Sequence, residues 1–112
     1  MSKSDGDVVI VSGVRTPIGK FGGALKDLRA HRLAGIVMGE ALRRAGVPAG
    51  DLGEVIAGEC IQCADEANTA RTAALAAGIP VEVPAYTIQK QCSSSMQALA
   101  PRRRSELTPL RR

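Results

Sequence analysis

The sequence predicts an α/β fold with a mostly parallel sheet, and three observations lead to this expectation. Residues 8–14 form a continuous apolar run, which is typical of a strand buried on both faces. Residues 30–45 carry apolar side chains at helical spacing. Beyond them, short apolar runs alternate with segments of good helix formers. The resulting order, β-α-β-α-β-α, is the pattern of a layered α/β fold.

The first two elements follow from the apolar pattern of the N-terminal half. Residues 8–14 predict a strand, and a Gly-rich connection follows it. Residues 30–45 predict a helix with one apolar stripe, made of Leu33, Ile36, Val37, Ala41 and Ala45. Gly46 and Pro48 end this helix in the usual way. We expect His31 to be a solvated residue of this helix.

The later elements are shorter. Residues 54–59 predict a second strand, and Asn68 is a candidate N-cap for a helix that runs to Ala77 and stops at Gly78 and Pro80. Residues 86–88 are strand formers. Residues 93–95 are serines, which offer capping groups, and residues 96–100 favour a helix. The third strand therefore leads directly into a third helix.

Composition limits what kind of protein this is. The chain has 112 residues, enough for one domain, and only 2% of them are aromatic, so small aliphatic side chains must build the core. The net charge of +4 comes from residues 101–112, which hold five Arg and one Glu. The first hundred residues carry ten basic and ten acidic side chains. The excess charge therefore does not describe a nucleic-acid-binding face, and we expect no nucleic-acid partner.

The chain divides into three expected parts. Residues 1–7 are a disordered N-terminus without the apolar stretch of a signal peptide or membrane span, so we expect no membrane partner. Residues 8–100 are a partial domain. Residues 101–112 are a basic, disordered tail that begins with Pro101 and lacks an apolar period. A frameshift or a premature natural end accounts for this abrupt change, and an ordinary solvated tail is the alternative. Three cysteines expected as free thiols indicate the cytoplasm, with an organelle as the alternative.

Cys92 is the candidate catalytic residue. It stands between the third predicted strand and the third helix, and functional sites of parallel sheets lie at the carboxyl ends of strands. A thiol at a helix N-terminus faces unpaired N–H groups and the positive end of the helix dipole, which favour the nucleophilic thiolate. The alternative is a buried structural cysteine, since free Cys is among the most buried residue types.

Cys60 and Cys63 form a C-x-x-C pair after the second predicted strand. This spacing occurs in redox proteins and in half of a zinc site. A zinc site needs two further ligands, and only Cys92 and His31 remain as candidates among the Cys and His of the sequence. We therefore favour two loop or core cysteines and expect no metal.

Four segments resemble the thiolase family. Residues 14–23 (VRTPIGKFGG) are similar to its opening signature, and the match continues through residues 67–71 (ANTAR) and 78–85 (GIPVEVPA). Residues 89–99 (QKQCSSSMQAL) resemble the block that carries the acyl-accepting cysteine. The resemblance runs from about residue 8 to residue 100 and implies the incomplete N-terminal half of a layered α-β-α thiolase fold. It covers roughly the first quarter of a usual thiolase.

The resemblance implies a function for Cys92. It would accept an acyl group from a CoA thioester, and a second CoA thioester would then attack it, forming acetoacetyl-CoA or a 3-ketoacyl-CoA; the reverse reaction cleaves these products. This is the chemistry of acetyl-CoA C-acetyltransferases and of the thiolases of fatty acid metabolism. The family uses CoA thioesters as substrates, with no tightly bound cofactor, and forms dimers or tetramers.

The chain departs from the family pattern in two ways. Ser95 stands where the family often has Gly. The C-terminal blocks that supply the activating His, an oxyanion site and the acid/base cysteine are not in the sequence, so we expect this chain by itself to be inactive. Two alternatives remain: a small redox or metal-binding protein that uses Cys60 and Cys63, or an interaction module that complements a second thiolase chain.

Overall fold

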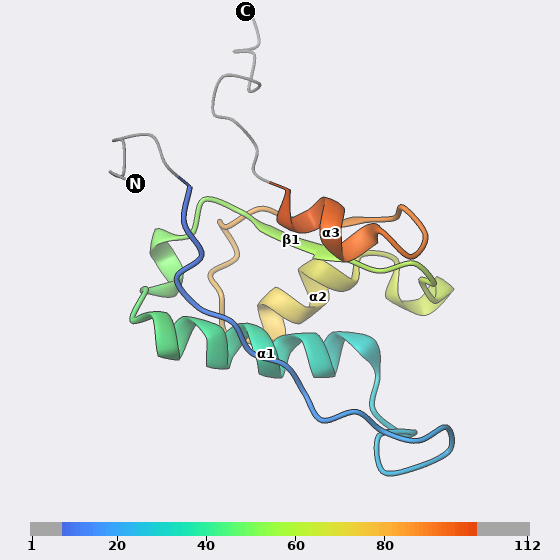
Figure 1. Cartoon of the computed structure of the whole chain (residues 1–112). Helices are drawn as coiled ribbons and strands as arrows, with labels where there is room; N and C mark the ends of the chain where they lie inside the picture. Colours follow the sequence, from blue (N-terminus) through green and yellow to red (C-terminus); the bar gives the residue numbers. More distant parts are fainter. Residues whose placement is uncertain (1–7, 101–112) are drawn as a thin grey trace, which may run out of the picture.

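The computed structural model describes residues 8–100 (Figure 1). Within this range three helices, α1 (Ala30–Ala45), α2 (Thr69–Ala76) and α3 (Ser94–Leu99), alternate with two strands, β1 (Val55–Gly58) and β2 (Ala85–Ile88). Two single 3-10 turns, η1 (Ala49–Asp51) and η2 (Ala64–Glu66), lie in the connections on either side of β1. The expected N-terminus at 1–7 and tail at 101–112 fall outside the described residues.

The two strands are parallel, so the predicted α/β fold with a parallel sheet is confirmed. Val55 pairs with Ala85 and Gly58 with Ile88, and the Glu59 amide extends the ladder by donating to the Ile88 carbonyl at 3.1 Å. Figure 1 shows α3 on one side of β1, and α2 followed by α1 on the other. The order of layers is therefore α3, sheet, α2, α1.

Small residues hold the layers together. The buried hydrophobic residues are Val55, Ala70, Ala73, Ala74, Ile79 and Val83, and Met38, Leu42 and Leu52 pack against this core. Gly35 is the buried residue of α1, and a Cβ atom there would lie 3.2 Å from the Ala73 carbonyl oxygen of α2. The two helices thus cross at close range because α1 presents a glycine at the contact.

The predicted ends of α1 and α2 agree with the structure. Gly46 adopts a left-handed conformation (φ 65°) after α1, which glycine tolerates without strain. Asn68 caps α2, its side-chain oxygen accepting from the Arg71 amide at 3.3 Å. The same side chain accepts from the Thr87 hydroxyl (2.9 Å) and donates to the Ala85 carbonyl (3.1 Å) of β2. One residue therefore caps a helix and ties it to the sheet.

The prediction of a strand over residues 8–14 is wrong. The segment has no strand assignment, and Val8, Val9, Ile10 and Val11 are between 54% and 76% exposed. Figure 1 shows it passing across α1 rather than lying in the sheet. A strand exists only through its hydrogen-bonded neighbours, and within residues 8–100 the only ladder joins β1 to β2. The observed order is α-β-α-β-α.

Among the described residues, no helix combines the length and the apolar character needed to cross a membrane.

Candidate functional site

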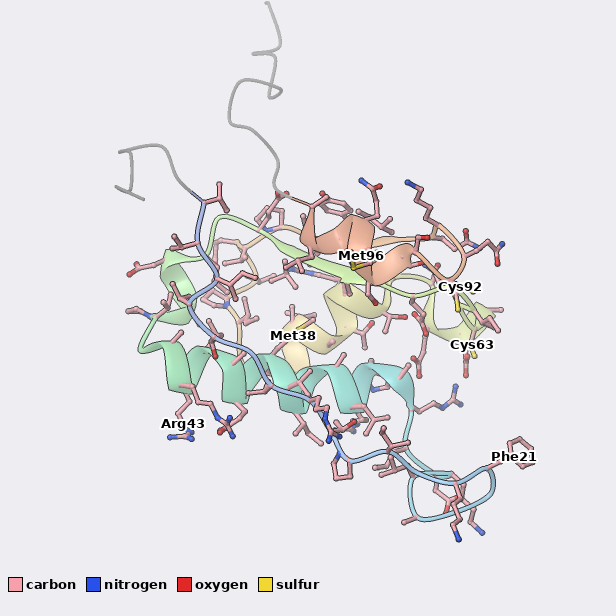
Figure 2. The ribbon with its side chains drawn as sticks, viewed as in Figure 1. Phe21, Met38, Arg43, Cys63, Cys92 and Met96 are labelled. Atoms are coloured by element: carbon pink, nitrogen blue, oxygen red, sulfur yellow. The ribbon has the colours of Figure 1, made fainter. Side chains whose placement is uncertain are left out.

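Cys92 lies in the turn that joins β2 to α3, at the carboxyl edge of the sheet. Its side chain is exposed and its thiol is free, so the alternative of a buried structural cysteine does not hold in this structure. Figure 2 shows Cys92 projecting at the same end of the molecule as Cys63. The structure thus puts the thiol where the sequence placed it, between a strand and a helix.

The Cys92 turn, residues 90–94, is held by one buried hydroxyl. The Ser94 hydroxyl accepts a hydrogen bond from the Lys90 amide at 2.8 Å and donates one to the Gln91 carbonyl at 2.7 Å. Two backbone bonds close the same turn, from Ser93 to Lys90 (3.0 Å) and from Ser94 to Gln91 (3.1 Å). Gln91 has a φ of 49°, in the left-handed region that is costly for a non-glycine residue.

The expectation that the serines cap α3 with their side chains is wrong. Ser93 occupies the N-cap position of α3, but its side chain makes no capping hydrogen bond. Ser94 is the buried one of the three serines, with 3% of its surface exposed, and its hydroxyl hydrogen-bonds the backbone of the turn instead of capping the helix. Composition alone could not separate the three, because which hydroxyl turns inward depends on how α3 packs.

Gly58, at the end of β1, is where α3 rests on the sheet. A Cβ atom on this residue would lie 2.5 Å from the Ser94 carbonyl oxygen and closer still to the Ser95 nitrogen. Any side chain would therefore overlap with the backbone of the first turn of α3. A glycine inside a strand signals such a close backbone approach, and this signal was available in the sequence.

Cys60 and Cys63 lie in the loop that follows β1 at the same edge of the sheet. Both are exposed and free, and Cys63 precedes η2 as its N-cap residue. The Gln89 side chain donates to the Cys60 carbonyl at 3.3 Å, which links the segments leaving β1 and β2. Within residues 8–100, no group of three or more His, Cys, Asp and Glu side chains is arranged to hold a metal ion.

His31 is not the solvated helix residue that the sequence suggested. It is largely buried, and its Nδ1 lies 2.8 Å from Oε1 of Glu66, a buried carboxylate of η2. Arg29 pairs with Asp65 beside it, which lowers the pKa of that carboxyl below its ordinary value. Arg29 also lies 3.7 Å from Glu66, so the start of α1 contacts both carboxylates of η2. Sequence reasoning missed these contacts because the partners are far apart along the chain.

Three of the five residues of the apolar stripe predicted for α1 line a cleft. Leu33, Ile36 and Val37 face residues 13–17 across a space of about 970 Å³, whose lining also includes Leu25, Leu28, Glu40 and Arg44. Ile36 stays 61% exposed. Beyond this cleft, Phe21 is fully exposed at the tip of a loop that projects from the body of the molecule (Figure 2). The cleft is lined by residues of 13–44 and does not include Cys92.

Comparisons with known proteins agree on one family. The family model of the thiolase N-terminal domain matches residues 8–105. An acetyl-CoA acetyltransferase from Syntrophomonas wolfei is 48% identical over 94 residues, which are 84% of this chain and 24% of that protein. A beta-ketothiolase from Cupriavidus necator is 44% identical over 94 residues, again 24% of its length. The chain thus spans about a quarter of the length of the curated relatives it matches.

Solved structures give the same result. The structure resembles the Bacillus anthracis acetyl-CoA acetyltransferase with a TM-score of 0.77 at 61% identity, covering 80% of this chain and 23% of that one. It resembles a thiolase from Ascaris suum, solved in complex with coenzyme A, with a TM-score of 0.74 at 38% identity, covering 78% of this chain and 23% of that one. Sequence and structure therefore lead to one conclusion: this chain belongs to the thiolase family, and its residues 8–105 match the family's N-terminal domain.

Proposed function

We propose that this chain supplies the acyl-accepting cysteine of a thiolase, and that Cys92 is this residue. The observation that carries the proposal is the position of an exposed, free thiol in the turn from β2 to α3, inside the segment that matches the thiolase N-terminal domain. Relatives named acetyl-CoA acetyltransferase indicate the substrate class, CoA thioesters. The resemblance of residues 89–99 to the family's cysteine block supports the choice of Cys92 over the other two thiols.

The reaction would proceed in two steps. The Cys92 sulfur attacks the carbonyl carbon of an acyl-CoA, a new carbon–sulfur bond forms, and CoA leaves as its thiolate, which takes up a proton. A second CoA thioester, deprotonated at its α-carbon, then attacks the enzyme-bound thioester and releases Cys92. Covalent catalysis of this kind replaces one difficult step with two easier ones.

The second step needs groups that residues 8–100 do not assemble around Cys92. The only histidine of the sequence is His31, and its Nδ1 lies against Glu66 rather than beside the Cys92 turn. A nucleophile without a base and oxyanion donors loses most of its rate. We therefore propose that the 112-residue chain by itself takes up an acyl group slowly and does not complete carbon–carbon bond formation. We place it in the cytoplasm, because its three cysteines are free thiols.

One observation favours a related second function, the binding of a polypeptide that carries the rest of a thiolase. The run from Val8 to Val11 is exposed, and the cleft along α1 is lined by leucine, isoleucine and valine side chains together with the charged Arg15, Glu40 and Arg44. Exposed apolar surface of this kind marks a site of protein association. Because the chain matches only about a quarter of its relatives, a chain with the remaining blocks is the partner of matching chemistry.

Mass spectrometry of the chain incubated with acetyl-CoA tests the proposal. We expect one acetyl group on Cys92 and much less on Cys60 or Cys63, although all three thiols are exposed. Cys92→Ala removes the modification, whereas the matched control Cys63→Ala keeps it. Equal acetylation of the three thiols, or none on Cys92, contradicts the assignment.

A mixing experiment separates the two functions. The remaining three-quarters of the Syntrophomonas wolfei relative is co-expressed with this chain, and acetoacetyl-CoA cleavage is measured with free CoA. Activity that requires both polypeptides and is lost in Cys92→Ala supports complementation. If Cys92 is acetylated but the two polypeptides do not co-purify, the assignment of Cys92 as the nucleophile holds and the proposed binding of a second polypeptide is wrong.

A further inference from the structure

The Cys92 turn contains one buried polar side chain, that of Ser94. Ser94 is 3% exposed, and its hydroxyl uses both its donor and its acceptor capacity on the backbone of the residues just before Cys92. Neither partner, the Lys90 amide nor the Gln91 carbonyl, belongs to the helix in which Ser94 lies. The hydroxyl therefore fixes the path of the chain into the cysteine and not the helix itself.

We infer that Ser94 is a positioning residue for Cys92, an inference that rests on the function proposed above. Its hydroxyl joins Lys90 and Gln91 from inside the turn, so the two residues that precede Cys92 keep one conformation. That conformation includes the left-handed Gln91, which an unrestrained glutamine leaves readily. Cys92 follows directly, and its exposed sulfur is held at the carboxyl edge of the sheet.

The position of Ser94 is itself set from below. Gly58 presents no side chain to the first turn of α3, so the backbone at residues 94 and 95 rests directly on β1. This contact places the Ser94 hydroxyl under the turn, where it can reach both partners. The packing of α3 on β1 thus determines where the Ser94 hydroxyl lies, and this hydroxyl in turn holds the backbone that precedes Cys92.

Hydrogen exchange of the unmodified chain tests the bridge first. Because the Lys90 amide donates to a buried hydroxyl, its exchange is expected to be slower than in an unstructured peptide. In Ser94→Ala this amide exchanges about fivefold faster or more, the factor that corresponds to loss of one hydrogen bond. An unprotected Lys90 amide in the unmodified chain overturns the inference without any variant, so a variant that fails to fold does not leave it untested.

The second test asks whether the bridge acts on Cys92. Alkylation with iodoacetamide is followed at each thiol by peptide mass spectrometry, with Cys60 and Cys63 as exposed internal references. In Ser94→Ala the rate at Cys92 relative to Cys60 falls at least twofold, because the loosened turn no longer holds the sulfur in one exposed position. Ser94→Thr, which keeps the hydroxyl, restores the ratio. The matched control Ser95→Ala, at an exposed neighbouring serine, leaves it unchanged.

The outcomes distinguish the inference from the proposed function. An unchanged ratio in a folded Ser94→Ala, or a failure of Ser94→Thr to restore it, shows that Ser94 only supports α3 and overturns the inference. Absence of acetyl transfer to Cys92 in the unmodified chain counts against the proposed function alone, since exchange at Lys90 and alkylation at Cys92 are measured without any CoA thioester.

Discussion

Replacing Gly58 with alanine changes the contact on which the site rests. The new Cβ would lie 2.5 Å from the Ser94 carbonyl oxygen, whereas non-bonded heavy atoms are about 3.5 Å apart at their optimum. The first turn of α3 must therefore move by roughly 1 Å. The clash is with backbone, so no side-chain rotation can relieve it. The displacement moves the Ser94 hydroxyl away from the Lys90 amide and the Gln91 carbonyl.

The expected loss of stability follows from two opposing terms. Overpacking of a filled contact costs about 1–3 kcal/mol, and a backbone clash belongs at the upper end of this range. Alanine restricts the unfolded chain more than glycine does, which returns about 0.5–1 kcal/mol. The free energy of unfolding should therefore fall by about 2 kcal/mol, or roughly 10 °C in the midpoint of thermal unfolding.

Urea unfolding followed by circular dichroism measures this effect, with Gly53→Ala as the matched control. Gly53 is exposed, and a Cβ atom there would meet nothing within 4 Å. Its substitution should leave the midpoint unchanged or raise it slightly. In Gly58→Ala, the rate of Cys92 alkylation relative to Cys60 should also change. Equal stability of the two variants would refute the reasoning that α3 sits directly on β1 at this glycine.

Three further predictions concern the scaffold. Gly39→Ala, where a Cβ atom meets nothing, should raise the free energy of unfolding by about 0.5–1 kcal/mol. Gly35→Ala, at the crossing of α1 with α2, should lower it by about 1 kcal/mol. Equal shifts of the two variants in urea unfolding would contradict the close crossing. Asn68→Ala should cost about 2 kcal/mol in thermal unfolding and Asn68→Asp less, because only the aspartate can still cap α2. Arg43 and Arg44 on α1 lower the pKa of Glu40 from 4.5 to about 2, so the contribution of Glu40 to stability is complete above pH 4.5 and disappears as the pH falls toward about 2. Glu40→Gln should flatten this part of the stability–pH curve. An unchanged curve would show that the contacts of Glu40 with the two arginines do not stabilise the protein in solution.

Local signals predicted the elements whose ends are determined by their own residues. The bounds of α1 agree to the residue, because an apolar stripe ends at a glycine that takes the left-handed conformation. The start of α2 agrees because Asn68 caps it. The position of Cys92 between a strand and a helix followed from the strand formers before it and the serines after it. In each case the deciding interactions lie within a few residues along the chain.

Features that depend on distant partners could not be predicted in this way. An apolar run such as residues 8–14 has the composition of a buried strand whether or not a neighbouring strand is present to pair with it. His31 of α1 contacts Glu66 of η2, and β1 lies between them in the sequence, so no pattern of neighbouring residues predicts this contact. Ser94 could not be separated from Ser93 and Ser95 until the packing of α3 was known.

The parallel pairing of β1 and β2 has a consequence for the order of folding. Because Val55 pairs with Ala85, the ladder closes only after the whole connection through η2 and α2 has been drawn together, which is a slow, non-local step. Gly58 and Ile88 end that ladder, and the Cys92 turn begins just beyond it. The contact of α3 with Gly58, which supports the Ser94 hydroxyl, is therefore expected to form with the sheet and not before it. Pulsed alkylation during refolding can follow this stage, because it measures the rate of Cys92 modification relative to that of Cys60 and Cys63.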